Sequence, residues 1–326
     1  MQNHPLNGKT IVITGASSGA GRMTALQFAR YKTCLVLAGR NMVALNETAE
    51  QCRNAGAETL VQRTDTGDYE MVKSLARAAK NWKGSIHVWV NNAGVLAAGV
   101  FDAVPMELHE KVIRTNLLGY MHGAHAVLRI FKDQGYGTLI NNISVGGYLP
   151  VPYGSCYSAS KFGVLGFFEA LKGELADWPH IHVCDLFPAF LNTPGIHHAA
   201  NYTGKVIKPA PPVFDPVHVA RACVRVALVP KPVTYIGFTA RPLKWIHIIC
   251  PAFMSYFTGR IIRKYLDKAN LIADTSGNVF DTVEFGMSTH GNNGNIPKPS
   301  KTLAASAAVG LLVGFWLTRA LSLRRS

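Results

Sequence analysis

The sequence is poor in acidic residues and has no paired cysteine motif. Nineteen aspartates and glutamates stand against 33 lysines and arginines, which gives a formal net charge of +14. The six cysteines lie at positions 34, 52, 156, 184, 223 and 250, and no two of them form a C-x-x-C motif. Cys34 and Cys184 fall in apolar segments typical of buried strands, so we expect reduced core cysteines rather than a disulfide framework.

Signals of a metal centre, of internal repeats and of nucleic-acid binding are also absent from the sequence. His122 and His125 have helical spacing and His197 precedes His198, but neither pair has an acid or cysteine in register, so we expect no metal. No repeat with a period of about 20 to 50 residues occurs. The basic residues form no runs with interleaved aromatics, which argues against a nucleic-acid partner. They gather around apolar segments in the last quarter of the chain, which favours an anionic membrane surface.

A glycine-rich turn lies close to the N-terminus. Residues 9–13 are a β-branched run typical of a buried strand, residues 14–21 read Thr-Gly-Ala-Ser-Ser-Gly-Ala-Gly, and a helical pattern follows. This order predicts a dinucleotide site, because glycines let the backbone approach a pyrophosphate and the helix N-terminus offers free N–H groups. The candidate cofactor residues of the turn are Gly15, Ser17, Ser18, Gly19 and Gly21.

Arg40 is the candidate for recognising the form of the cofactor. It follows an apolar strand at residues 34–38, at a point where NAD-binding proteins carry an acid that grips the ribose 2′-hydroxyl. The first acid after this strand is Glu47, whereas the guanidinium of Arg40 suits a 2′-phosphate. We therefore expect NADP(H) as the cofactor, with NAD(H) as the alternative.

Tyr157 and Lys161 are the candidate acid–base pair. They stand four residues apart, so a helix would point both side chains in the same direction. An ammonium beside the phenol would lower the phenol pKa from its ordinary value near ~10 and make proton transfer usable near neutral pH. Solvent-exposed helices without a function also show this spacing, so the assignment depends on the rest of the sequence.

Together these motifs resemble the short-chain dehydrogenase/reductase family in its short, single-domain form, over about residues 8–240. Residues 91–94 read Asn-Asn-Ala-Gly and are similar to the NNAG element of that family, which adds Asn92 and Ala93 to the cofactor residues. Asp65 resembles the aspartate that contacts the adenine in the family. The catalytic tetrad of the family falls on Asn116, Ser144, Tyr157 and Lys161.

A further element of the family lies at residues 188–193, which resemble the motif P-G-x-x-x-T. Ala189 stands where glycine is usual, and we expect it to stiffen the backbone beside the nicotinamide. Thr193 is retained, and the resemblance assigns it to the nicotinamide carboxamide.

The resemblance implies an α/β fold, a Rossmann-like doubly wound parallel sheet with helices on both faces. It also implies hydride transfer between the nicotinamide C4 and an alcohol or carbonyl carbon, with a proton moved by Tyr157. Ser144 would bind the substrate oxygen, and Lys161 would lower the pKa of Tyr157 and bind the nicotinamide ribose. Asn116 would hold a water that connects Lys161 to solvent.

The last eighty residues differ from those of a plain soluble enzyme. Residues 245–257 are apolar, flanked by basic side chains and interrupted by Pro251, so they are too short to span a bilayer. We expect them to cover the substrate pocket or to lie on a membrane surface. Residues 302–323 are almost uncharged and carry a G-x-x-x-G motif, which predicts a membrane-anchor helix, with a soluble helix docked on a partner as the alternative.

The sequence therefore predicts four parts: a Rossmann-fold NADP(H)-binding catalytic domain (1–240), a C-terminal extension that forms a substrate-pocket or membrane-surface segment (241–287), a flexible linker (288–301) and a transmembrane helix (302–323). The N-terminus shows no signal peptide, so we expect the catalytic domain to remain cytosolic.

We interpret the chain as a membrane-anchored, NADP(H)-dependent alcohol dehydrogenase or carbonyl reductase. Its expected partners are a lipophilic small-molecule substrate, the membrane and, as a homo-oligomer, further copies of itself. The alternatives are an NAD(H)-dependent alcohol dehydrogenase, a non-catalytic binding or scaffold protein on the same fold and, more remotely, a sugar-nucleotide epimerase.

Overall fold

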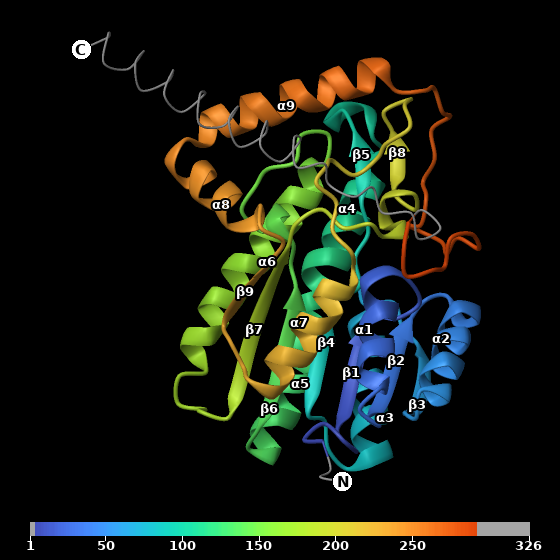
Figure 1. Ribbon diagram of the computed structural model, residues 1–326, viewed down its shortest axis with the longest axis vertical. Coiled ribbons are helices and arrows are strands. Elements are labelled where there is room, and N and C mark those ends of the chain that lie inside the picture. Colours follow the sequence, from blue (N-terminus) through green and yellow to red (C-terminus); the bar gives the residue numbers. More distant parts are fainter. Residues whose placement is uncertain (1–3, 292–326) are drawn as a thin grey trace.

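A single parallel sheet forms the centre of the protein. The computed structural model describes residues 4–291, and within them seven strands form this sheet in the order β3-β2-β1-β4-β6-β7-β9. The strand order reverses between β1 and β4, so the fold is doubly wound and the topological switch point lies there. Helices cover both faces of the sheet (Figure 1), which confirms the Rossmann-like architecture expected from the sequence.

The strands of the sheet are β1 (Thr10–Thr14), β2 (Cys34–Gly39), β3 (Glu58–Arg63), β4 (Val88–Asn91), β6 (Gly137–Asn142), β7 (Ile181–Pro188) and β9 (Val233–Ile236). Two short strands, β5 (Ala97–Gly99) and β8 (Ala200–Tyr202), pair separately. The helices are α1 (Gly19–Ala29), α2 (Met42–Asn54), α3 (Tyr69–Lys83), α4 (Met106–Ile113), α5 (Gly119–Gln134), α6 (Ser155–Glu174), α7 (Val217–Leu228), α8 (Ala240–Ile249) and α9 (Pro251–Lys268).

Alternating side chains of the central strands fill two cores. Along β1, Ile11 and Ile13 pack into the core shared with α1, α2 and α7, whereas Val12 packs into the core shared with α3, α5 and α6. This alternation is the period of two that a strand imposes on its side chains. Because both faces are covered, every residue of β1 and β2 is buried, which explains their continuous apolar runs.

Local sequence signals set the ends of several helices. The Asn41 side chain accepts a hydrogen bond from the Ala44 amide at the start of α2, and the carboxylate of Asp68 caps α3 in the same way. Gly84 ends α3 in the left-handed region, at φ 74°. The Asp215 carboxylate accepts a hydrogen bond from the Val217 amide at 2.7 Å, at the start of α7.

The C-terminal extension consists of two helices and an irregular segment. Pro251 occupies the first turn of α9, so the apolar run expected at residues 245–257 is divided between α8 and α9. Beyond α9 the chain, coloured red in Figure 1, returns to the blue N-terminal half of the fold. In the described part of the chain no helix has the length and apolar character needed to cross a bilayer. The predicted anchor at 302–323 lies outside the described residues, as does the linker from residue 292 onward.

Candidate functional site

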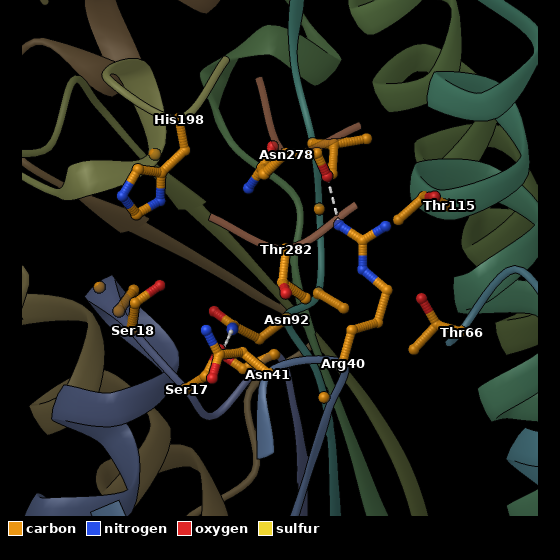
Figure 2. A pocket seen from close by; sticks show the side chains of 18 of the residues that line it. Ser17, Ser18, Arg40, Asn41, Thr66, Asn92, Thr115, His198, Asn278 and Thr282 are labelled. Atoms are coloured by element: carbon orange, nitrogen blue, oxygen red, sulfur yellow. Dashed lines mark hydrogen bonds between the residues drawn. The ribbon is translucent and has the colours of Figure 1, made fainter. Parts of the chain in front are cut away.

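A cavity of about 250 Å³ lies at the carboxyl ends of β1, β2, β3 and β4, beside the switch point (Figure 2). This is the place where doubly wound sheets bind nucleotides. The cavity is lined by nine of the predicted cofactor residues: Gly15, Ser17, Ser18, Gly19, Arg40, Asp65, Asn92, Ala93 and Thr193. Residues that are far apart in the sequence therefore meet around one hollow, as the motifs predicted.

The glycine-rich turn is packed so closely that side chains do not fit. A Cβ on Gly21 would lie 2.1 Å from the Gly15 carbonyl oxygen, and Gly15 itself has φ +67°. The Asn92 side chain donates to the carbonyls of Thr14 at 3.0 Å and Gly15 at 3.3 Å, which fixes the turn against the end of β4. Gly21 does not line the cavity; it allows α1 to start close to the turn. Gly15, Ser17, Ser18 and Gly19 of this turn line the cavity, and their close-packed backbone fits a dinucleotide, whose pyrophosphate needs such close approach.

Asp65 and Arg40 lie at the end of the cavity formed by β2 and β3. Asp65 pairs with Lys111, with 2.7 Å between Oδ2 and Nζ, and accepts from the Gly67 amide at 2.9 Å. Burial raises the pKa of Asp65, but the hydrogen bonds from Lys111 and Gly67 outweigh it and leave the pKa below its ordinary value. Arg40 points along the cavity wall (Figure 2), and a guanidinium there can hold an anionic group of a ligand.

Tyr157 and Ser144 approach each other from α6 and from the turn after β6. Ser144 has φ +103°, a conformation that is strained for a side-chain-bearing residue and that is found mostly at functional sites. Its hydroxyl accepts from the Gly146 amide at 3.1 Å. Burial raises the pKa of Tyr157, and a hydrogen bond with Ser144 opposes that rise. The net direction differs from the predicted lowering, because desolvation of the phenol outweighs the neighbouring groups.

Lys161 is buried, with 4% of its surface exposed. Its Nζ lies 3.4 Å from the carbonyl of Asn142, 3.5 Å from the Tyr120 hydroxyl, and 4.7 and 5.9 Å from the ring centres of Tyr120 and Tyr157. No carboxylate of the described residues forms an ion pair with it. Burial therefore lowers the pKa of Lys161 to about 7. The sequence predicted an ammonium near the phenol, and Nζ lies 5.9 Å from the Tyr157 ring centre, but the sequence could not predict that the ammonium would itself be poorly compensated.

Asn116 lies in a π-helical turn, Arg114–Leu118, and is fully buried. Its amide accepts from the Val95 amide and donates to the Val95 carbonyl, both at 2.8 Å, and it donates to the Ser160 hydroxyl at 3.3 Å. The side chain thus ties the loop after β4 to α6, on which Tyr157 and Lys161 stand. π-helical turns occur mostly at functional sites.

The substituted glycine of the P-G-x-x-x-T element causes no clash. Ala189 is buried and packs with Val145 and Ala240, and its amide donates to the Ile236 carbonyl at 2.9 Å. Gly237, which directly follows β9, lies beside Ala189, and because it has no side chain it leaves room for the methyl group of Ala189. Thr193 reaches the cavity although the element begins with alanine.

Several lining residues were not predicted from the sequence. They are Asn41, Thr64, Thr66, Thr115, Asn142, His198, Asn278, Thr282, Val283 and Met287, among others. Asn41 follows β2 and Asn142 ends β6, both at the carboxyl edge of the sheet, so their positions alone could have indicated them. The last four come from a segment more than 180 residues after the NNAG element, for which the sequence offers no signal.

Cys156, His122 and His125, which the sequence singled out as reactive or spaced like metal ligands, do not line the cavity. Burial raises the pKa of the Cys156 thiol, which keeps it in its less nucleophilic form. His122 and His125, which are spaced like metal ligands, contact the Thr66 carbonyl at 2.9 Å and the Tyr69 hydroxyl at 2.8 Å.

Comparison with known proteins agrees with this geometry. A family model described as short chain dehydrogenase matches residues 9–201. Estradiol 17-beta-dehydrogenase 11 of Mus musculus is 32% identical over 213 residues, which are 65% of this chain and 72% of that protein. An alcohol dehydrogenase from the archaeon Thermococcus sibiricus, complexed with 5-hydroxy-NADP, is similar in structure with a TM-score of 0.60 and 25% sequence identity. The match covers 71% of this chain and 96% of the archaeal chain. A short chain dehydrogenase/reductase from Burkholderia phymatum in complex with NAD is similar in structure with a TM-score of 0.65 and 26% sequence identity. The match covers 85% of this chain and 100% of that chain.

The matched region contains the glycine-rich turn, the NNAG element and the Ser144, Tyr157 and Lys161 positions. One of the two similar structures holds an NADP derivative and the other NAD, so they agree on a nicotinamide dinucleotide but differ in its form. The protein is an oxidoreductase that acts on CH–OH donors and has a nucleotide-binding Rossmann fold. The chain belongs to the short chain dehydrogenase family.

Proposed function

We propose that the protein is an NADP(H)-dependent oxidoreductase that interconverts a carbonyl and a primary or secondary alcohol on a lipophilic substrate, with Tyr157 as the acid–base residue. The observation that carries the proposal is the meeting of Ser144, Tyr157 and Lys161 beside the dinucleotide cavity. Lys161 reaches the carbonyl of Asn142, and Asn142 lines that cavity. The proton-transfer groups therefore stand next to the place where a nicotinamide would lie.

The chain supplies the proton and the charge stabilisation for this chemistry. When bound, the nicotinamide cofactor donates or accepts the hydride. Tyr157 gives its phenolic proton to the substrate oxygen during carbonyl reduction, and its raised pKa keeps the phenol protonated at neutral pH. Ser144 donates a hydrogen bond to the same oxygen as negative charge develops on it. Lys161 then stabilises the phenolate, and Asn116 holds the water through which the proton is replaced.

Arg40 supports NADP(H) rather than NAD(H). The carboxylate that would bind a ribose 2′-hydroxyl is missing after β2, and a guanidinium lines the cavity in its place. A guanidinium has five N–H donors, and three of the Arg40 donors contact backbone carbonyls of residues 278–280. Two donors have no acceptor among the described residues, which is the number that a bidentate contact with a phosphate uses.

The surface of α8 and α9 supports a lipophilic substrate taken up at a membrane. Trp245, Ile248, Ile249 and Tyr256 are between 54% and 63% exposed, and they follow one another at helical spacing across the corner between the two helices. Exposed basic residues of α9 continue the surface. An apolar strip with adjacent cations suits the interface of an anionic bilayer. The similar mouse protein is named for estradiol, a lipophilic alcohol.

The membrane attachment completes the proposal. Residues 302–323 would span the bilayer and hold the catalytic domain on its cytosolic face, so that α8 and α9 lie near dissolved substrate. We further propose a homo-oligomer, for which light scattering of the purified protein is the test. The support for both comes from the sequence and from the family, since residues 302–323 lie outside the described part of the chain.

The deciding experiment measures NADPH and NADH oxidation against ketosteroids, long-chain aldehydes and 3-ketolipids. We expect turnover with NADPH and with at least one lipophilic carbonyl. Turnover restricted to NADH would overturn the cofactor assignment and favour the NAD(H) alternative. Cofactor binding without turnover on any substrate, in either direction, would favour a binding or scaffold protein.

A further inference from the structure

An irregular segment after α9 lies over the dinucleotide cavity. We call residues 278–288 the strap. Its first residues are anchored firmly: the Asn278 amide donates to the His198 carbonyl at 2.7 Å, and Val279 is fully buried in a core with Val95 and Leu108. Further along, the Phe285 carbonyl contacts His198 Nε2 at 3.0 Å. The strap is therefore an ordered part of the fold.

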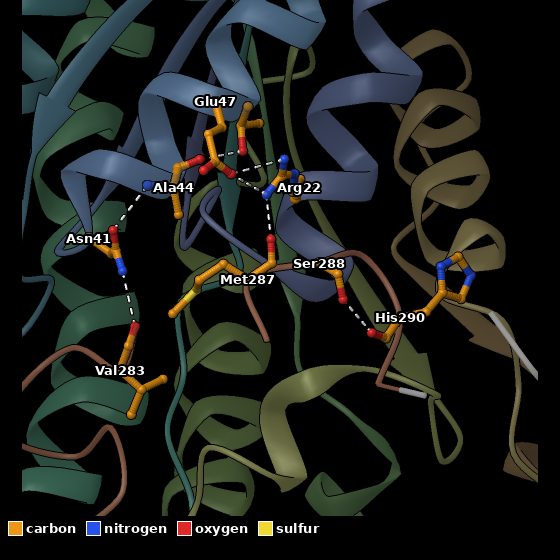
Figure 3. Close-up of polar contacts among 9 residues, drawn as sticks. Arg22, Asn41, Ala44, Glu47, Val283, Met287, Ser288 and His290 are labelled. Carbon is orange, nitrogen blue, oxygen red and sulfur yellow. Dashed lines mark hydrogen bonds and ion pairs between the residues drawn. The ribbon is translucent and has the colours of Figure 1, made fainter. Parts of the chain in front are cut away.

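The strap contacts the cofactor half of the fold through backbone carbonyls (Figure 3). These carbonyls accept hydrogen bonds from Asn41 Nδ2 (to Val283, 3.1 Å), the Arg22 guanidinium (to Met287) and the Gly19 amide (to Ser288, 2.8 Å). Gly19 and Arg22 belong to the first turn of α1, which follows the glycine-rich turn. The described part of the expected linker, from Ser288, thus contacts the catalytic domain instead of leaving it.

Arg40 holds the other end of the strap. Its guanidinium donates to the carbonyls of Val279 at 3.1 Å and Phe280 at 2.9 Å, and to that of Asn278. The same guanidinium is the residue proposed to recognise the 2′-phosphate. Two donors of the Arg40 guanidinium have no acceptor among the described residues, so Arg40 can bind the strap and a phosphate together. Its contact with the strap would orient the guanidinium for the phosphate, and a bound phosphate would orient it for the strap.

The cavity lies between the strap and the glycine-rich turn. Asn278, Thr282, Val283 and Met287 of the strap line it together with the predicted cofactor residues. Asn278 Oδ1 is buried without a hydrogen-bond partner among the described residues, and so are two other polar atoms of lining residues, Thr115 Oγ1 and Asn142 Oδ1. Buried polar atoms are nearly always paired in proteins, so their presence here indicates a polar ligand.

We propose that the strap is the outer wall of the dinucleotide site, that it closes over the bound cofactor, and that the cofactor leaves only when the strap opens. The inference rests on the proposed NADP(H) function. The opposite role would be a strap that competes with the cofactor by occupying its donors. The strap occupies one donor of the turn, the Gly19 amide. The wall is nevertheless favoured because a hollow remains beneath the strap, strap side chains line that hollow, and two Arg40 donors have no acceptor among the described residues.

A substitution at Gly286 allows the strap to be loosened in the full-length protein, and one at Gly84 provides the control. Gly286 has φ +67°, and a Cβ there would lie 3.0 Å from His198 Nε2. Gly286→Ala therefore strains the backbone and pushes the strap from His198. Gly84→Ala is the matched control, because Gly84 has φ +74° at the end of α3 but no atom within 4 Å of its Cβ position. Circular dichroism and thermal unfolding would establish that each variant is folded.

The experiment measures NADPH binding and dissociation by stopped-flow fluorescence in the parent protein and both variants. Gly286 directly precedes Met287, whose carbonyl accepts from the charged Arg22 guanidinium, and such a contact is worth about ten-fold in an equilibrium constant. We therefore expect Gly286→Ala to increase the NADPH dissociation rate constant about ten-fold or more and to weaken affinity, with Gly84→Ala unchanged. In the parent protein, NADPH should slow amide hydrogen exchange in residues 280–288, a measurement that does not depend on how well Gly286→Ala folds.

Three results would overturn the inference. Tighter NADPH binding in Gly286→Ala, or faster strap exchange when NADPH is added, would make the strap a competitor. An unchanged dissociation rate constant, in a variant whose strap exchanges faster, would make it a structural element only. If the parent and both variants turn over substrate normally in these cases, the proposed function stands without the strap. If the parent binds neither NADPH nor NADH, the proposed function and the inference fail together.

Discussion

Replacing Lys161 by methionine should stabilise the protein, and the gain should be larger at pH 6 than at pH 9. Burial lowers the pKa of Lys161 to about 7, from 10.5 for the free side chain. Its two hydrogen-bond contacts, at 3.4 and 3.5 Å, are longer than the usual range, so little compensates the buried charge. The unfolded chain therefore binds the proton more strongly than the folded protein does.

The sign and the size of this stability difference follow from the linkage between protonation and folding. Between pH 7 and about 10.5 the unfolded state carries the proton and the folded state loses it, so the cost of Lys161 falls as pH rises. A shift of this size costs about 5 kcal/mol at pH 6 and about 2 kcal/mol at pH 9. The difference in unfolding free energy between Lys161→Met and the parent should therefore be about 2–3 kcal/mol larger at pH 6.

Urea unfolding followed by tryptophan fluorescence, at both pH values, is the assay. Lys264→Met on the exposed surface of α9 controls for the loss of one positive charge, and its effect should not change with pH in this way. The same stability difference for Lys161→Met at both pH values would refute the reasoning, because it would mean that the ammonium is solvated or paired in the folded protein.

Three further predictions concern catalysis, cofactor choice and the membrane. Tyr157→Phe should reduce kcat about 100-fold or more while NADPH still binds, because only the proton donor is lost; turnover within a few-fold of the parent would exclude Tyr157 as the acid. Arg40→Asp should shift selectivity about 10- to 100-fold from NADP(H) toward NAD(H), measured as the ratio of kcat/KM values; an unmoved ratio would show that Arg40 serves the strap alone. Full-length protein should resist release from membranes by high salt and carbonate, whereas protein truncated after Asn292 should remain active and bind anionic vesicles only at low salt, through α8 and α9. Release of the full-length chain by salt would contradict the spanning helix.

Much of the site could be predicted because its residues follow strands at fixed short distances. The glycine-rich turn, Arg40, Asp65 and Asn92 each come within two residues of the end of a strand, and parallel strands bring their carboxyl ends to one edge. The spacing of Tyr157 and Lys161 within one helix is likewise a local property. The local sequence pattern and the parallel topology together were sufficient to predict where these residues lie in the fold.

The strap could not be predicted, because its contacts use backbone carbonyls that every residue possesses. Residues 281–288 include two exposed acids, Asp281 and Glu284, and have no regular period, so the sequence gives them the character of a loop. What decides their position is the burial of Val279 and the left-handed turn at Gly286, both of which depend on His198 and its surroundings. The directions of the pKa shifts were also inaccessible, since desolvation depends on tertiary packing.

Burial acts on the two proton-transfer groups in a chemically consistent way. It raises the pKa of Tyr157 and lowers that of Lys161, so both side chains are driven toward their neutral forms. A neutral phenol is a competent proton donor, which suits the reduction of a carbonyl. When Tyr157 loses its proton, the new phenolate attracts positive charge, and Lys161, whose ring-to-ammonium distance is 5.9 Å, gains a partner that raises its proton affinity. In the proposed mechanism, the stability that the protein loses by burying an uncompensated lysine would be recovered, in part, when the phenolate forms, and stabilisation at that point would accelerate the reaction.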